Sequence, residues 1–196
     1  MTVHAKLGAS GMYRWSACPG SVRLSKAAPK TQSAYAQDGT DAHSLAALVL
    51  RKNTDPLKYV GTEIESEGRS VKVTEAMAEG VGVYVNHLRS TCQPDDVDRI
   101  ECRFDLSSIY PGCFGTADFV RWRQSEKLLI VTDYKHGMGV FVSAEDNPQL
   151  KYYGLGALLA SGYPAAKIRL EIVQPRFGGA DPIRSYEIDA IDLIDF

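Results

Sequence analysis

The stretch GTADFVRWRQSEKLLIVTDYK, residues 115–135, decides the fold of the chain. Two apolar runs flank a short polar break within it, a pattern that is typical of a β-hairpin. A turn centred on Ser125 and Glu126 would place Asp118 directly opposite Asp133 on neighbouring strands. Directly opposite residues have Cβ atoms roughly 4.5–5.5 Å apart. The sequence therefore predicts two carboxylates in contact on one face of a sheet.

This pair of aspartates is costly unless a partner compensates it. Like charges directly opposite each other destabilise a sheet, and each carboxylate raises the pKa of the other. A hard divalent cation removes the conflict, because Mg²⁺ and Mn²⁺ favour carboxylate, carbonyl and water oxygens. Lys135 lies two residues beyond Asp133, so its side chain is expected on the same face. The alternative is a turn shifted by one residue, which would put Asp118 and Asp133 on opposite faces.

The composition is that of a globular protein without a broad basic surface. The 196 residues are 44% hydrophobic and 23% charged, with a formal net charge of −2. No apolar run approaches the roughly 20 residues of a membrane helix, and the N-terminus lacks a signal-peptide pattern. We therefore expect a cytoplasmic protein without a membrane partner. The charge argues against a general nucleic-acid coat protein, but a nuclease needs only local cations.

The hydrophobic periodicity predicts one domain of helices and strands over residues 1–196. The family resemblance given below implies that it is α/β, with a central mixed sheet flanked by helices. Helices are expected over residues 13–53, and a further helix and the core sheet over residues 74–189. The chain stops at Phe196 inside a helical pattern. The C-terminus is therefore expected to be truncated from a longer product.

Local signals set the expected ends of the helices. Asp41 is expected to cap a helix that runs to Arg51 and follows a turn at Gly39-Thr40. Thr74 and Asn147 are expected to cap two later helices, since both are strongly preferred at the N-cap.

Two further patterns are interpreted as structural. The helix after Thr74 carries apolar residues at helical spacing, Tyr84 among them, and this stripe is expected to pack into the core. In the expected strand over residues 98–106, three apolar residues should share one face: Ile100, Cys102 and Phe104. Glu101 falls on the other face. Solvent exposure is its simplest interpretation, and an outer carboxylate near the metal is the alternative.

Four short motifs together resemble those of one nuclease family. They are GTDAH at residues 39–43, GTAD at 115–118, DYK at 133–135 and QLKYY at 149–153. Their order and spacing resemble RecB-type nucleases of the PD-(D/E)xK superfamily. The layout looks most like phage- or prophage-encoded exonucleases, which are related to CRISPR spacer-adaptation exonucleases. Each motif is weak alone, but the four in order span most of the chain.

The resemblance implies a PD-(D/E)xK core, similar to restriction endonucleases, and a metal-dependent deoxyribonuclease in phage recombination or DNA processing. Such a protein would work in the cytoplasm of a bacterial host. The family pattern implies that Asp118, Asp133, the carbonyl of Tyr134 and the imidazole of His43 hold Mg²⁺ or Mn²⁺. A histidine ligand suits Mn²⁺ better. Taken in isolation, His43 would more simply be a surface or capping residue.

The resemblance also implies roles for three side chains beside the metal. Lys135 is expected to orient the attacking water or to stabilise negative charge in the transition state, and whether it accepts a proton stays open. Gln149 and Tyr153 share a helix face and are expected to position the lysine or the DNA backbone. The alternative function is a non-catalytic module on the same fold that binds nucleic acid or protein.

Some members of the resembled family hold a [4Fe–4S] cluster on four cysteines. Cys18 resembles the first of these, but no cysteine follows Cys113, so no cluster is expected in this chain. DNA is the expected partner, together with a single-strand annealing or binding protein of a phage recombination complex. Five scattered cations could contact phosphates, although such residues usually serve solubility: Lys26, Lys30, Lys151, Lys167 and Arg169.

Overall fold

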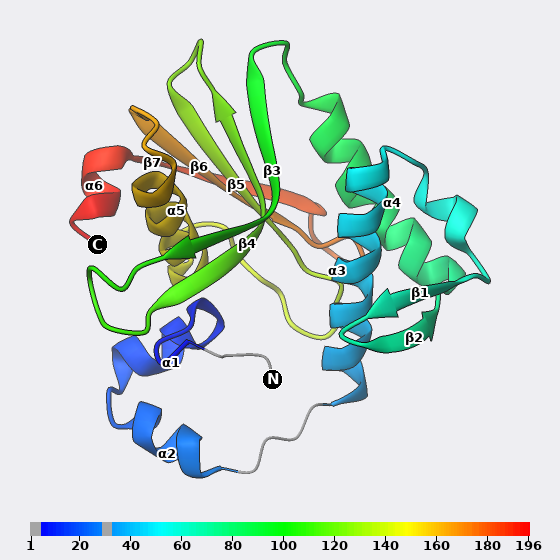
Figure 1. Cartoon of the computed structure of the whole chain (residues 1–196), viewed down its shortest axis with the longest axis horizontal. Helices are drawn as coiled ribbons and strands as arrows, with labels where there is room; N and C mark the ends of the chain where they lie inside the picture. Colours follow the sequence, from blue (N-terminus) through cyan, green and yellow to red (C-terminus); the bar gives the residue numbers. More distant parts are fainter. Residues whose placement is uncertain (1–4, 29–32) are drawn as a thin grey trace.

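A five-stranded mixed sheet with helices on both faces forms the core of the chain (Figure 1). The computed structural model describes residues 5–28 and 33–196. The strands lie side by side in the order β3 (Asp96–Asp105), β4 (Phe114–Arg123), β5 (Leu128–Tyr134), β6 (Lys167–Val173) and β7 (Ile183–Asp189). This arrangement confirms the predicted α/β class and the central mixed sheet.

The hydrogen-bonding pattern of the sheet follows from how its strands are connected. Strands β3, β4 and β5 form an antiparallel meander, whereas β5 and β6 are parallel and β6 and β7 antiparallel. A parallel pair needs a crossover, and helix α5 (Pro148–Ser161) provides it. Every residue of β5 is buried, as expected of a central strand covered on both faces.

The hairpin of β4 and β5 has the register that the sequence predicts. Its ladder runs from Arg123 opposite Leu128 to Phe119 opposite Thr132. Continued by one residue beyond the end of the ladder, this register would bring Asp118 opposite Asp133. The alternative turn, shifted by one residue, is therefore wrong.

Helices cover the two faces of the sheet in separate groups (Figure 1). One core packs α3 (Ala34–Lys52) and α4 (Glu75–Ser90) together with a small hairpin, β1 (Glu63–Ser66) and β2 (Arg69–Lys72). The other core packs α5 with the N-terminal η1 (Ala9–Gly11) and α1 (Met12–Ala17) and with the C-terminal α6 (Ala190–Ile194). Two short helices complete the described chain. The first, α2 (Ser21–Ala27), follows α1, and the second, η2 (Pro56–Tyr59), packs against the α3–α4 core.

Helix α3 begins earlier than predicted. Its N-cap is Ser33, whose hydroxyl accepts from the backbone N–H of Ala36, so Gly39-Thr40 lies inside the helix and is not a turn. Asp41 is therefore not a cap; its buried carboxylate accepts from the Ser66 hydroxyl at 2.6 Å. The continuation of the helix through Gly39 places His43 at mid-helix and not in the first turn.

The other predicted helix ends give a mixed result. Thr74 and Asn147 cap α4 and α5 as predicted, each accepting from a backbone N–H three residues on. The helical stretch expected over residues 13–53 is split, because α1 ends at Ala17 and α2 begins at Ser21. Residues 29–32 of that stretch lie outside the described residues. No helix in the described part of the chain is long and apolar enough to cross a membrane.

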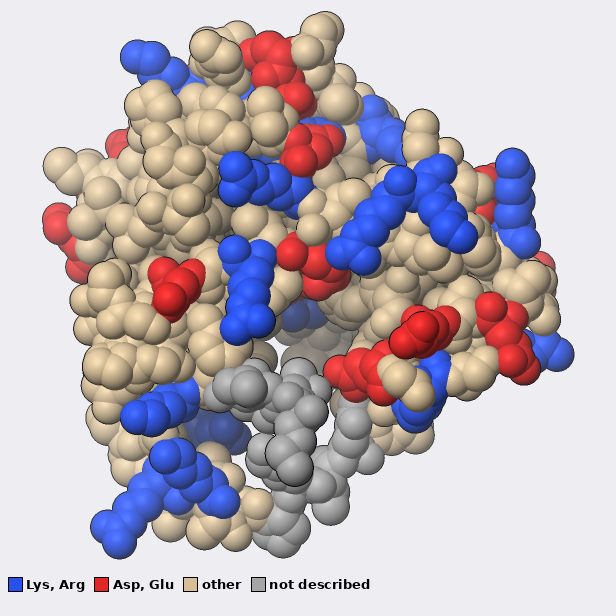
Figure 2. All heavy atoms as spheres, in the orientation of Figure 1, with Lys and Arg blue, Asp and Glu red and all other residues tan. Residues whose placement is uncertain are grey.

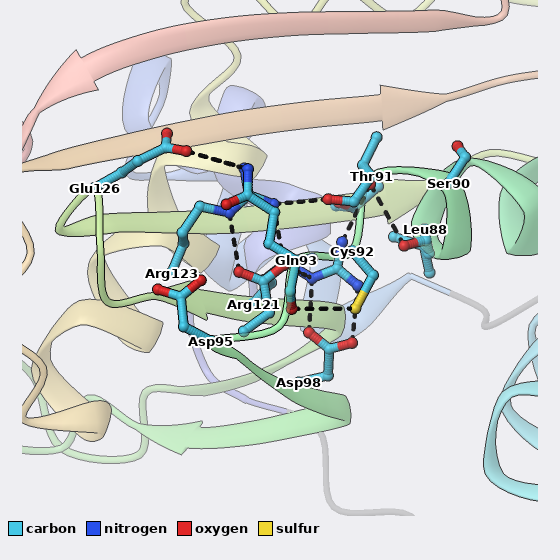
Figure 3. A network of polar contacts seen from close by, with 12 residues as sticks. Leu88, Ser90, Thr91, Cys92, Gln93, Asp95, Asp98, Arg121, Arg123 and Glu126 are labelled. Carbon is cyan, nitrogen blue, oxygen red and sulfur yellow. Dashed lines mark hydrogen bonds and ion pairs between the residues drawn. The ribbon is translucent and has the colours of Figure 1, made fainter.

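Two buried arginines tie the far end of β4 to β3 (Figure 3). The Arg121 guanidinium donates two hydrogen bonds to Asp98, at 2.7 and 2.8 Å. Arg123 donates in the same way to Asp96, at 2.9 and 3.0 Å. Paired donation of this kind fixes geometry as well as adding energy, so the network fixes the register of the two strands.

Strand β3 is kinked at Glu101, which has a positive φ of 52°. The kink interrupts the ladder, whose pairs on either side are Ile100 with Phe119 and Cys102 with Ala117. Ile100 packs against the α3–α4 core, whereas Cys102 packs against the α5 core. The prediction that Ile100 and Cys102 share a face was therefore wrong. A non-glycine residue in this backbone region is strained, and such residues cluster at functional sites.

Candidate metal centre

Three side chains from three elements bring potential metal ligands together. His43 of α3, Glu101 of β3 and Asp118 of β4 each present a ligand atom, and these atoms lie within 4.8 Å of one another. The three ligand atoms lie close together because β3 is kinked at Glu101 and because His43 lies in the middle of α3. The set offers one imidazole nitrogen and two carboxylates, which are donors that suit Mn²⁺.

Asp118 is held in place by two hydrogen bonds. Its Oδ1 lies 3.2 Å from Nδ1 of His43, and its Oδ2 accepts from the backbone N–H of Tyr134 at 2.7 Å. Burial alone would raise the pKa of Asp118, but the His43 charge and these hydrogen bonds hold it below its usual value. Asp118 is therefore ionised and ready to ligate a cation.

Asp133 is engaged differently, in a chain of polar contacts that leads to helix α5. Its Oδ2 lies 2.7 Å from Nζ of Lys135, which also donates to Oε1 of Gln149 at 3.2 Å. The Gln149 amide in turn donates to the Tyr153 hydroxyl at 3.0 Å. Burial raises the pKa of Asp133, and Lys135 opposes the rise. The sequence analysis assigned four residues to one site, and the structure links them in one series of polar contacts: Asp133, Lys135, Gln149 and Tyr153.

Without a cation, the negative charges of Asp118 and Asp133 are compensated by the protonated His43 and by Lys135. A proton on Glu101 keeps a further negative charge out of the cluster. Burial lowers the pKa of His43, but the charges of Asp118 and Asp133 and the bond to Asp118 together raise it to about 9. Burial, followed by the Asp118 charge, raises the pKa of Glu101 to about 7. A divalent cation could replace both protons, so the donor set fits such an ion in charge as well as in ligand type.

Two hollows meet at this cluster. A cleft of about 1090 Å³ is lined by Asp118, Tyr134 and Lys135, and a smaller hollow of about 580 Å³ adjoins it. Both are lined by Thr40, His43 and Glu101. The ligand cluster therefore borders both hollows.

The cations beside the two hollows are Arg51, Lys52, Lys135 and Arg176. On the face drawn in Figure 2, Lys and Arg side chains are spread over the surface with acidic side chains among them. The cations singled out in the sequence line neither hollow: Lys26, Lys151, Lys167 and Arg169. Two of these are paired with acids, Lys151 with Asp146 and Arg169 with Glu187. Lys30 lies outside the described residues.

A second polar network supports Tyr134 from the cleft side. The Tyr134 hydroxyl lies 2.8 Å from Nδ1 of His136, whose Nε2 lies 2.5 Å from Nη1 of Arg176. Arg176 also donates to Asp38 of α3 at 3.1 Å. Burial and the Arg176 charge lower the pKa of His136 to about 4, so His136 is neutral. Its Nε2 then accepts from Arg176 and its Nδ1 donates to Tyr134.

A family model described as "Protein of unknown function (DUF2800)" matches residues 4–196. The chain belongs to the DUF2800 family. Among solved structures, one described as "Crystal structure of SSO0001" is 16% identical, with 95% of this chain and 85% of that chain covered. Its TM-score is 0.26, so this likeness carries no argument about the DUF2800 chain.

Sequence reasoning on the DUF2800 chain placed Glu101 near the metal only as the alternative to a solvent-exposed strand residue. Asp133 was expected beside His43 and Asp118, but the cluster of mutually close donors contains Glu101 in that place. The alternation of apolar and polar residues in β3 could not reveal the kink that turns Glu101 toward His43. The only sequence signal was an acid in the strand that pairs with the Asp118 strand.

Proposed function

We propose that this DUF2800 chain is a metal-dependent DNA nuclease that hydrolyses phosphodiester bonds. In this proposal its sheet and flanking helices are a PD-(D/E)xK core of the RecB type, as in phage- and prophage-encoded exonucleases. The observation that carries the proposal is the meeting of His43, Glu101 and Asp118 in one open cleft, which is also lined by Lys135, the partner of the buried Asp133.

The ligands proposed for Mg²⁺ or Mn²⁺ are His43, Asp118, Asp133 and the carbonyl of Tyr134, to which the geometry adds Glu101. The bound cation would polarise the scissile phosphate and lower the pKa of a bound water. Asp118 keeps its ligand orientation through the backbone N–H of Tyr134. This bond also ties Asp118 to the strand that carries Asp133 and Lys135.

Lys135 acts in this proposal as a fixed positive charge. Burial lowers its pKa, but the Asp133 carboxylate more than offsets this and raises the pKa above its usual value. A lysine with a raised pKa is a poor general base at neutral pH. It instead stabilises the negative charge that develops on the phosphate in the transition state. Gln149 and Tyr153 position it from helix α5.

DNA would enter through the two hollows, with its phosphates near the cations that line them. Arg51 and Lys52 line the smaller hollow, and Arg176 lines the larger cleft. A strand that crosses the cluster would therefore meet positive charge in both hollows. The proposed partner is a phage single-strand annealing or single-strand-binding protein. The proposed location is the cytoplasm of a bacterial host.

The test is to incubate the protein with Mn²⁺ or Mg²⁺ and end-labelled linear or closed circular DNA, each single- and double-stranded. We expect cleavage that requires the cation and is lost in Asp133→Asn. Product lengths then separate cleavage from an end from internal cleavage. DNA binding without cleavage under every condition would contradict the enzyme and favour the non-catalytic module.

A further inference from the structure

The N-terminal segment of the chain is basic, although the chain as a whole is slightly acidic. The first acidic residue in the sequence is Asp38. Five cations precede it: Lys6, Arg14, Arg23, Lys26 and Lys30. A solvated surface usually mixes charges of both signs, whereas this segment carries positive charge only. The formal net charge of −2 therefore gives no sign of this local excess.

Three of these cations line one hollow at the N-terminal helices. Lys6, Arg14 and Lys26 line this basic hollow of about 460 Å³, and no acidic residue of the described chain lines it. The three side chains are exposed, and none of them takes part in the ion pairs within residues 5–28 and 33–196. At the lower left of Figure 2, over α1 and α2, Lys and Arg side chains gather without acidic ones among them. The basic hollow is therefore free to take a ligand with negative charge.

The basic hollow adjoins the cleft of the candidate metal centre. Ser10 of η1 is exposed and lines both of them. The same cleft is lined by His43, Glu101 and Asp118. A polymer that extends from the metal centre past Ser10 therefore reaches the basic hollow.

The wall of the basic hollow is attached to the helix that carries Tyr153. The Tyr152 hydroxyl of α5 donates to the carbonyl of Leu7 at 3.0 Å, and the Trp15 indole N–H donates to the carbonyl of Gly8 at 2.9 Å. The rings of Trp15 and Tyr152 also meet edge to face, with centroids 6.5 Å apart. The next residue, Tyr153, belongs to the polar contacts that lead to Asp133. η1 and α1 therefore have a fixed place relative to the metal centre.

We propose that the basic hollow is a second DNA-binding site, in which Lys6, Arg14 and Lys26 bind phosphates of the strand that passes the metal centre. The inference rests on the proposed nuclease function and extends it to a surface away from the scissile bond. Ser21 and Ser25 line the same hollow, and their hydroxyls are further donors to phosphate oxygens. Contacts of this kind position a strand without reading its sequence, and the affinity that they add falls as salt rises.

The test is the double variant Arg14→Gln with Lys26→Gln, and the readout is fluorescence anisotropy of labelled single-stranded DNA at several salt concentrations. EDTA is present throughout, so that no cation supports cleavage. Each phosphate contact that is lost should lower the slope of log affinity against log salt by about 0.7, so the double variant should lose about 1.4. The affinity should fall equally for DNA of different sequences. Both side chains are exposed, so thermal unfolding should match that of the wild type.

Lys58→Gln with Lys72→Gln is the matched control, since it removes the same charge from exposed residues that line none of the three hollows. It should keep the wild-type slope. An unchanged slope in Arg14→Gln with Lys26→Gln, or an equal loss in the control, would overturn the second site and leave the nuclease proposal intact. Absence of DNA binding by the wild type would also overturn the second site. Absence of Mn²⁺-dependent cleavage as well would overturn both.

Discussion

The Nδ1 atom of His43 lies 3.2 Å from the Oδ1 atom of Asp118, which joins the middle of helix α3 to strand β4. The other oxygen of Asp118 is bonded to the backbone of β5. One carboxylate thus links a helix and two strands at the point where the candidate ligands meet. The protonation of His43 reports on this link directly.

Replacing Asp118 with Asn should lower the pKa of His43. The wild-type value is about 9 because the Asp118 and Asp133 charges outweigh burial, which alone would lower it. Without the Asp118 charge we expect the value to fall toward 6.5 or lower. An NMR titration of the His43 imidazole in EDTA measures this shift. A His43 pKa that stays near 9 in Asp118→Asn would contradict the assigned cause.

The stability of the metal-free protein should fall as pH rises from 5 to 8. Glu101 has a pKa of about 7 in the folded protein against 4.5 in the unfolded chain. Its contribution is therefore fully present below pH 4.5 and is lost as pH rises through 7. His43 adds a loss at higher pH, between 6.5 and 9. Chemical denaturation in EDTA at several pH values checks this.

Glu101→Gln is the matched variant for this prediction. It should remove the decline between pH 5 and 7 and keep the later decline that is due to His43. Saturating Mn²⁺ should remove both declines in the wild type, because ligation replaces the protons. If the stability of Glu101→Gln in EDTA depended on pH just as that of the wild type does, Glu101 would not titrate as described.

Lys135→Ala should lower DNA cleavage by about 10²–10³-fold, the range typical of losing one preorganised electrostatic contact. The reason is that its Nζ is held between Asp133 and Gln149 and has no substitute there. Single-turnover cleavage with saturating Mn²⁺ measures the effect. Lys72→Ala, on the exposed strand β2, should leave the rate unchanged. Comparable rates in Lys135→Ala and wild type would exclude a catalytic role.

Two glycines of helix α4 offer a paired test of the packing behind the metal centre. At Gly82 a Cβ would meet only Pro56, at an ordinary 3.7 Å, so Gly82→Ala should stabilise the helix by about 0.5–1 kcal/mol. At Gly80 a Cβ would lie 3.0 Å from the Tyr134 hydroxyl and 3.3 Å from His136. Gly80→Ala should therefore not stabilise the protein as Gly82→Ala does, and it should weaken Mn²⁺ binding. Equal denaturation midpoints and Mn²⁺ affinities in the two variants would contradict this.

The parts of the structure that local chemistry determines could be predicted from the sequence. The register of the β4–β5 hairpin follows from two apolar runs and a short polar turn, and the ladder between Arg123 and Phe119 confirms it. The caps at Thr74 and Asn147 follow from side-chain hydrogen bonds within one turn. These features depend on neighbours in the sequence alone.

The parts that depend on tertiary packing could not be predicted. Gly39 was expected to interrupt α3, but the helix passes through it, and the interior Asp41 bonds to Ser66 and Arg69 of a distant hairpin. The positive φ of Glu101 is invisible in a sequence that otherwise alternates as a strand. Both errors concern the same site, because they decide where His43 and Glu101 lie.

The central claim is that this cluster of acids and His43 binds a divalent cation in order to cut DNA. The most direct measurement is cleavage of end-labelled linear DNA by wild type and Asp118→Asn, each with Mn²⁺ and with EDTA, alongside circular dichroism to show that both are folded. The account predicts cleavage only by the wild type and only with Mn²⁺. Cleavage by folded Asp118→Asn at the wild-type rate would contradict it.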